Sequence, residues 1–210
     1  VVRPQHALGV RARGGELGLR SAPAAGWVTT LALWRLDIAS ELLFVGDAGI
    51  TEPSRPSRRQ GVEWTNLWTP LPGVSVDADL AVSSARFRDA DVAGARVPGA
   101  AGVVASVGVG VDRGERWFGG LRLRHFGARP LIEDNSVRSA SSTLTNLKVG
   151  FRLDRRITLS LDVLNLFNRR VSDIDYYYES QLKSESFPVA DIHADPSEPR
   201  SLRLGLRVAL

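Results

Sequence analysis

The sequence of 210 residues predicts an all-β chain that forms part of an antiparallel transmembrane β-barrel. Three observations lead to this fold class. Apolar and polar residues alternate along most of the chain, the alternating runs are about 9–11 residues long, and short connections alternate with long ones. Strands of that length cross a bilayer when they are tilted, whereas no run of about 18 uncharged apolar residues provides a membrane-spanning helix.

About nine strands are expected along the chain, with no amphipathic helix between them. The first three, around 8–21, 27–44 and 59–69, alternate weakly. The next six alternate clearly, at 74–83, 103–112, 116–124, 146–153, 157–163 and 201–210. In the last strand the apolar face consists of Leu202, Leu204, Leu206, Val208 and Leu210.

The connections between these strands differ in length in a regular order. Short connections are expected at 22–26, 70–73, 112–115 and 154–156, and long ones at 46–58, 87–100, 127–141 and 169–199. Strict alternation places every long connection at the same end of the strands. Short periplasmic turns and long extracellular loops are typical of outer-membrane barrels.

The polar face of the strands is made of Arg, Asp, Ser and Gly, and in a barrel it faces an enclosed lumen. The arginines expected on this wall are Arg122, Arg124, Arg152, Arg203 and Arg207, together with Arg58 and Arg59. Such a wall would pair with carboxylates of a plug or attract an anionic ligand. The alternative is simple solvation and pairing with acids on adjacent strands, namely Asp77, Asp79 and Asp162.

Aromatic residues lie near the ends of the expected strands, where they fit interfacial girdles. They are Trp27, Trp64, Trp68, Trp117, Phe118, Phe126 and Phe167. The same residues would also fit the core of a soluble β-sandwich whose polar faces contact water. A soluble β-sandwich that binds a ligand is therefore the alternative fold and function.

Several motifs, in their order along the chain, resemble the C-terminal part of TonB-dependent outer-membrane receptors. Arg-Arg-Gln-Gly-Val-Glu at 58–63 is similar to a strand opening of that family, and Leu-Asp-Val-Leu-Asn-Leu-Phe-Asn at 161–168 resembles its Asn-Leu-Phe-Asn signature. Further similar segments lie at 97–100, 125–131, 142–150, 173–178, 191–193 and 198–203.

The resemblance implies a barrel of about 22 strands closed around an N-terminal plug. Residues 1–210 would supply the C-terminal portion of that barrel, while the plug and the earlier strands would lie outside this chain, which begins with Val1 rather than a start residue. The implied function is TonB-dependent uptake of a scarce nutrient. Ferric siderophores are the commonest cargo of the family, and haem, cobalamin and sugars are others.

The resemblance also implies a location in the bacterial outer membrane and a set of partners. These are outer-membrane lipid, the plug of the full-length chain, the TonB–ExbB–ExbD complex acting through the missing N-terminal part, and the barrel-assembly machinery acting through the C-terminal strand. Leu210 stands where many such barrels end in Phe, which is expected to weaken the last of these interactions.

The longest connection contains a polar and aromatic cluster that is the candidate ligand site. Its residues are Asp173, Asp175, Tyr176, Tyr177 and Tyr178. Their oxygens could contact a ligand or hold a hard cation. The alternative is a loop that packs on its own aromatic side chains.

No cofactor, metal site, enzymatic activity or nucleic-acid partner is expected. The chain has no Cys, so thiolate zinc sites are excluded, and its three scattered His do not favour a catalytic triad. Asp191, His193 and Asp195 share one face if extended, but their residue types are too generic to assign a metal. Glu133 and Asp134 are expected in a solvated turn. The net charge is +4, and the arginines are interspersed with acids rather than clustered.

Overall fold

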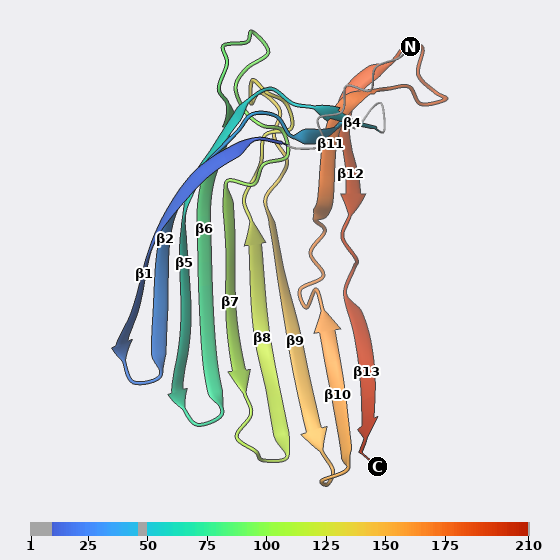
Figure 1. Cartoon of the computed structure of the whole chain (residues 1–210). Helices are drawn as coiled ribbons and strands as arrows, with labels where there is room; N and C mark the ends of the chain where they lie inside the picture. The colour runs from blue at the N-terminus through green and yellow to red at the C-terminus, as the bar shows by residue number, and fades with distance from the viewer. Residues whose placement is uncertain (1–9, 46–49, 210) are drawn as a thin grey trace, which may run out of the picture.

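The structure is a computed structural model, and it describes residues 10–45 and 50–209. A single antiparallel sheet of nine strands forms a curved wall (Figure 1). The sheet confirms the expected number of strands. In order across the sheet they are β1 (Ala12–Ala24), β2 (Trp27–Ile38), β5 (Ser57–Leu71), β6 (Val74–Phe87), β7 (Val103–Val111), β8 (Trp117–Phe126), β9 (Ser142–Arg152), β10 (Ile157–Leu164) and β13 (Ser201–Val208).

Two smaller hairpins are inserted between strands of this wall. One consists of β3 (Leu42–Val45) and β4 (Ile50–Pro53), and the other of β11 (Ser172–Ser180) and β12 (Val189–Pro196). The expectation of one strand over 27–44 was therefore wrong, because β2 ends at Ile38 and the chain then turns. The hydroxyl of Ser54 accepts from the Glu41 amide at 3.2 Å, and the hydroxyl of Ser40 donates to the Ser54 carbonyl at 3.0 Å.

The expected alternation of connections is confirmed, since the tight turns lie at one end of the wall and the long connections at the other (Figure 1). The expected loop at 169–199 contains β11 and β12. Of the expected loop at 46–58, residues 46–49 lie outside the described residues, while 50–53 form β4 and β5 begins at Ser57. Leu210 also lies outside the described residues.

The two faces of the wall differ as the alternation predicts. Leu19, Leu31, Trp64 and Leu80 follow one another across four neighbouring strands of the apolar face. On the last strand Leu204 is 88% exposed, opposite Leu161, and Leu159 is also exposed. No second sheet covers this face in the part of the chain that the structure describes. A sandwich would bury these side chains, so the soluble alternative is not favoured.

Aromatic side chains gather at the tight-turn end of the apolar face. Trp27 lies directly opposite Trp68, and the rings of Trp117 and Phe151 are 4.6 Å apart. Phe118 departs from the expected girdle, because strand alternation places it on the opposite face from its neighbour Trp117.

The most buried side chains lie toward the long-loop end, on the ends of wall strands and on the connections beyond them. Val97 is 1% exposed, and Phe87 and Leu131 are almost as buried. The connections 88–102 and 127–141 are joined by backbone bonds from the Arg96 amide to the Glu133 carbonyl and from the Gly99 amide to the Pro130 carbonyl, both at 2.8 Å. These two connections therefore form a small packed unit, called here the loop cap.

Within residues 10–45 and 50–209, no helix has the length and apolar character needed to cross a bilayer.

Candidate functional site

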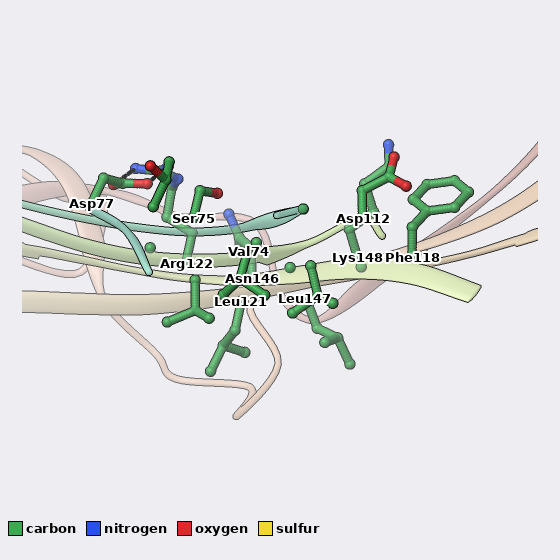
Figure 2. A pocket seen from close by; sticks show the side chains of 18 of the residues that line it. Val74, Ser75, Asp77, Asp112, Phe118, Leu121, Arg122, Asn146, Leu147 and Lys148 are labelled. Atoms are coloured by element: carbon green, nitrogen blue, oxygen red, sulfur yellow. Dashed lines mark hydrogen bonds and ion pairs between the residues drawn. The ribbon is translucent and has the colours of Figure 1, made fainter. Parts of the chain in front are cut away.

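The polar face contains a groove of about 810 Å³ near the tight turns. Figure 2 shows that Asp77, Asp112 and Phe118 project to one side of the sheet at this groove, whereas Leu121 and Leu147 project to the other. The groove is therefore lined mainly by the polar set of each strand. This arrangement follows from the period of two in the sequence.

The charged side chains of the groove are paired with one another. Both terminal nitrogens of Arg122 donate to the carboxylate of Asp77, at 2.8 and 2.9 Å. Lys148 lies opposite Asp162, with 3.3 Å between Nζ and Oδ1. Asp77 thus pairs with one of the expected arginines, from two strands away rather than from an adjacent strand, whereas Asp162 pairs with Lys148. These pairs leave little net charge on this part of the wall.

The pair of Asp77 and Arg122 depends on Gly108, which lies between them on β7. The two residues are on β6 and β8, and both are register partners of Gly108. A Cβ atom at Gly108 would lie 2.5 Å from Asp77 Oδ1 and 2.8 Å from Arg122 Nη2. A glycine at this position lets the ion pair cross the middle strand.

Arg152 lies at the tight-turn end and has three partners, one of which is the Glu115 carbonyl, to which Nη1 donates at 2.9 Å. Its Nη2 is 2.6 Å from Asp112 Oδ2, and its guanidinium stacks 4.4 Å from the centroid of the Phe118 ring. The pKa of Asp112 is lowered by the hydrogen bond from Arg152, and the Gly114 amide adds to the same effect. Arg152 therefore holds the turn between β7 and β8 against the end of β9.

The remaining arginines expected on the polar wall differ in their partners. Arg203 approaches Glu198 at 3.9 Å, and both side chains are well exposed. The side chains of Arg124 and Arg207 make no ion pair or hydrogen bond with any residue that the structure describes. Strand alternation places Arg58 on the face of Val62 and Trp64, where it pairs with Asp37 at 2.7 Å. The expectation that Arg58 faces the same wall as Arg122 was therefore wrong.

A second pocket, of about 340 Å³, lies at the long-loop end of β8 and β9. It brings together Arg124, Asp173 and Asp175, which sequence reasoning had placed in two separate groups, and it adds Arg129 and Phe126. Asp175 is nearly buried, and its Oδ2 lies 3.4 Å from Arg129 Nη2. The same nitrogen donates to the Asp173 carbonyl at 3.1 Å. Arg129 thus fixes the base of the β11–β12 hairpin to the loop cap.

The three tyrosines lie on β11 and alternate across its two faces. Tyr176 is the register partner of His193, and the ring of Tyr178 stacks on the His193 ring with 3.7 Å between centroids. Tyr177 lies opposite Ile192. This packing agrees with a connection that packs on its own aromatic side chains. In the described part of the chain, no group of three or more His, Asp or Glu side chains is arranged to hold a metal ion.

Sequence reasoning missed the role of Arg55, which joins three connections. Its guanidinium bonds to Asp89 at 3.1 Å and Glu133 at 2.6 Å, and it stacks 4.2 Å from the centroid of the Phe87 ring. Asp91 lies 3.6 Å away. These residues are far apart in the sequence and follow no spacing rule, so only the folded chain shows that they meet.

Glu133 therefore does not lie in a simple solvated turn. Burial raises the pKa of Glu133, and the nearby Asp91 and Asp89 add to this effect, while Arg55 opposes it. Gly94, at a φ of +112°, allows its loop to approach the Glu133 backbone, since a Cβ there would lie 2.4 Å from the Glu133 carbonyl. The adjacent Asp134 behaves as expected of a turn residue, because the Ser136 amide lowers its pKa.

Comparison with known proteins gives one family match and several similar structures. A family model described as TonB dependent receptor-like, beta-barrel, matches residues 10–166. The closed form of the ferric-catecholate import receptor Fiu from E. coli K12 is 21% identical, with a TM-score of 0.70, over 95% of this chain and 27% of that one. The ferric yersiniabactin uptake receptor FyuA from Yersinia pestis is 22% identical, with a TM-score of 0.72, over 95% of this chain and 30% of that one.

The copper transporter OprC has the same strand arrangement at 15% identity and a TM-score of 0.68, over 95% of this chain and 32% of that one. This chain thus spans less than a third of the length of each of these proteins. At such identities the likeness extends to the fold alone.

Proposed function

The chain belongs to the TonB-dependent receptor β-barrel family, and from this premise we propose that it forms the C-terminal portion of a bacterial outer-membrane receptor for the uptake of a scarce nutrient. The observation that carries the proposal is the contrast between the two faces of the wall. Its apolar face is uncovered and rich in Leu, Val and Trp, while its other face holds paired charges. A barrel wall between lipid and an aqueous interior needs this contrast.

In the proposed orientation the tight turns lie in the periplasm and the long connections outside the cell. The pair of Trp27 and Trp68 and the pair of Trp117 and Phe151 then lie at the periplasmic interface, where aromatic rings are enriched. The candidate ligand-binding residues Asp173, Asp175, Tyr176, Tyr177 and Tyr178 lie at the outer end. That is the end at which a ligand from the medium arrives.

The proposed cargo is a ferric siderophore. Support comes from Fiu, a ferric-catecholate import receptor, and from FyuA, a ferric yersiniabactin uptake receptor. OprC is instead a copper transporter, so the strand arrangement alone does not select the cargo. The selectivity must then reside in side chains of the loops and the wall.

The full receptor is proposed to contain a plug and earlier strands outside this chain. Arg122, Arg124, Arg152, Arg203 and Arg207 would line its interior toward that plug. Energy would come from the TonB–ExbB–ExbD complex through the plug-bearing part, and the barrel-assembly machinery would recognise the last strand. No catalytic step is needed for this function.

The test is uptake by cells that carry the complete gene. Deletion of the gene should abolish growth on a ferric siderophore as the iron source, and loss of TonB should have the same effect. A matched strain with the gene restored is the control. Growth that is unaffected by the deletion on every iron source tried, or a complete protein that folds as a monomer without detergent, would refute the proposal.

A further inference from the structure

We propose that the pocket of about 340 Å³ at the long-loop end binds an anionic oxygen group of the ligand, a carboxylate or a phosphate, between Arg124 and Arg129, and that Asp175 is an internal competitor for this site. The inference rests on the proposed function, because it assigns a ligand chemistry to the outer end of the same receptor.

The first observation behind this inference is that the side chain of Arg124 has no charged or hydrogen-bonding partner among the described residues. Its side chain lines the pocket and makes no ion pair or hydrogen bond with another described residue. Arg122, two residues earlier on the same strand face, is in contrast held by Asp77 through both terminal nitrogens. A guanidinium has five N–H donors in a planar fork that matches a carboxylate or a phosphate. Among the described residues, no acceptor occupies the guanidinium donors of Arg124.

The contact between Arg129 and Asp175 is the second observation. Only Nη2 of Arg129 takes part in it, and the distance to Asp175 Oδ2 is 3.4 Å. Strong pairs between guanidinium and carboxylate are shorter, at about 2.7–2.9 Å, and are often bidentate. Asp175 therefore occupies Arg129 in a loose geometry. An oxygen anion in the pocket could bind the guanidinium of Arg129 more closely than Asp175 does, and so displace the Asp175 carboxylate from it.

The rest of the pocket agrees with an anion site. The carboxylate of Asp173 accepts a hydrogen bond from the Ser197 hydroxyl, so it already has a partner. Phe126 and Leu144 supply apolar lining, which strengthens a charge-assisted hydrogen bond by limiting water. The volume is at the lower end of the range of about 300–1,000 Å³ for small-molecule pockets. It suits one anionic group of a ligand rather than a whole large ligand.

The test measures binding of citrate and of inorganic phosphate to the complete purified receptor by calorimetry. The two probes distinguish a carboxylate site from a phosphate site. We expect Arg124→Gln to weaken binding of the preferred anion by about tenfold or more, because a charge-assisted bond is lost. Asp175→Asn should tighten it several-fold, because the competing charge is removed. Arg122→Gln is the matched control and should change the affinity by less than about twofold, because Arg122 already has Asp77 as its partner.

Arg124→Gln removes no side-chain hydrogen bond or ion pair within the described residues, so this variant still tests the proposal if Asp175→Asn loosens the hairpin. Absence of measurable binding of either anion, or an unchanged affinity in Arg124→Gln, would overturn the proposal. Weaker binding in an Asp175→Asn receptor with an intact hairpin would overturn the role given to Asp175. Loss of uptake with intact anion binding would instead count against the proposed function alone.

Discussion

The strand wall and the loop cap bury their side chains in opposite ways. On the wall, large apolar side chains such as Leu17 and Leu204 are exposed, and several charges, such as those of Asp77 and Arg122, are paired across strands. At the long-loop end, Phe87 (the last residue of β6) and Val97 and Leu131 of the cap are almost fully buried, beside connections that contain little regular structure. The wall therefore depends on an apolar medium and on neighbouring strands, while the cap has a core of its own.

This difference indicates that the long connections are ordered structures rather than loose links. Arg55 bonds to groups from two other connections and stacks on Phe87, so several loops are held by one guanidinium. A receptor that presents binding residues on such loops gains from this order, because preorganised side chains lose less conformational entropy when a ligand binds.

The largest expected effect concerns the wall without its neighbours. Among the described strands, β1 and β13 each have one edge without a hydrogen-bonded partner. Open edges are not tolerated in hydrocarbon. Residues 1–210 expressed alone should therefore aggregate or fail to insert into lipid vesicles, as measured by sedimentation and protease protection. A stable, inserted monomer would contradict this and would imply closure as a small barrel.

The next effect concerns the core of the cap. Phe87→Ala in the complete receptor should lower the free energy of opening of residues 88–102 by about 3–5 kcal/mol, as for other buried Phe side chains. The cause is a cavity beside Val97 and loss of the ring on which Arg55 stacks. Hydrogen exchange of this segment measures it. Leu204→Ala is the control, since that side chain is 88% exposed. Equal effects of the two variants would show that the cap has no separate core.

A smaller effect is expected within the wall at Gly108. Gly108→Ala should separate Asp77 from Arg122 and cost about 1 kcal/mol, because the pair is partly exposed and such pairs contribute little. Unfolding in urea measures the change. Gly18→Ala is the matched control, because the nearest atom to its Cβ would be 3.8 Å away. If Gly108→Ala remained destabilising by the same amount in an Asp77→Asn, Arg122→Gln background, the pair would not be its cause.

The smallest effect is a difference in pH dependence between the two ends. The pKa of Glu133 is raised above its ordinary 4.5, so its contribution to cap stability is full below that value and is lost as pH rises through the raised pKa. The pKa of Asp112 is lowered below its ordinary 3.8, so its contribution to the tight turn is present above 3.8 and is lost as pH falls through the lowered pKa.

Hydrogen exchange should therefore show the cap losing protection as pH rises above 4.5, and the turn losing protection as pH falls below 3.8, where Asp134 makes the cap lose protection as well. Glu133→Gln should remove the trend of the cap above pH 4.5 and leave the turn unchanged, and Asp112→Asn should remove the trend of the turn and leave the cap unchanged. Parallel trends in both regions, insensitive to either substitution, would contradict this origin of the pH dependence.

Much of the wall followed from local sequence. Side chains of a strand alternate between its two faces. Leu202, Leu204 and Leu206 therefore had to lie on one face of the last strand, and Arg203 on the other. The lengths of the connections then determined at which end of the strands the tight turns lie. The same rule shows why Phe118 had to lie on the other face of β8 from Trp117, although both were expected in one girdle.

The sites depended on contacts that no local pattern contains. Arg55 meets Glu133 across 78 residues, and Arg129 meets Asp175 across 46. The pairing of Arg122 with Asp77 required the strand register that brings Gly108 between them. The sequence by itself determined strands, faces and the side of the long connections, because these follow from the period and spacing of residues. Only the tertiary structure decided which charges are paired with one another among the described residues, because ion pairs form between groups that the folded chain brings within a few ångströms.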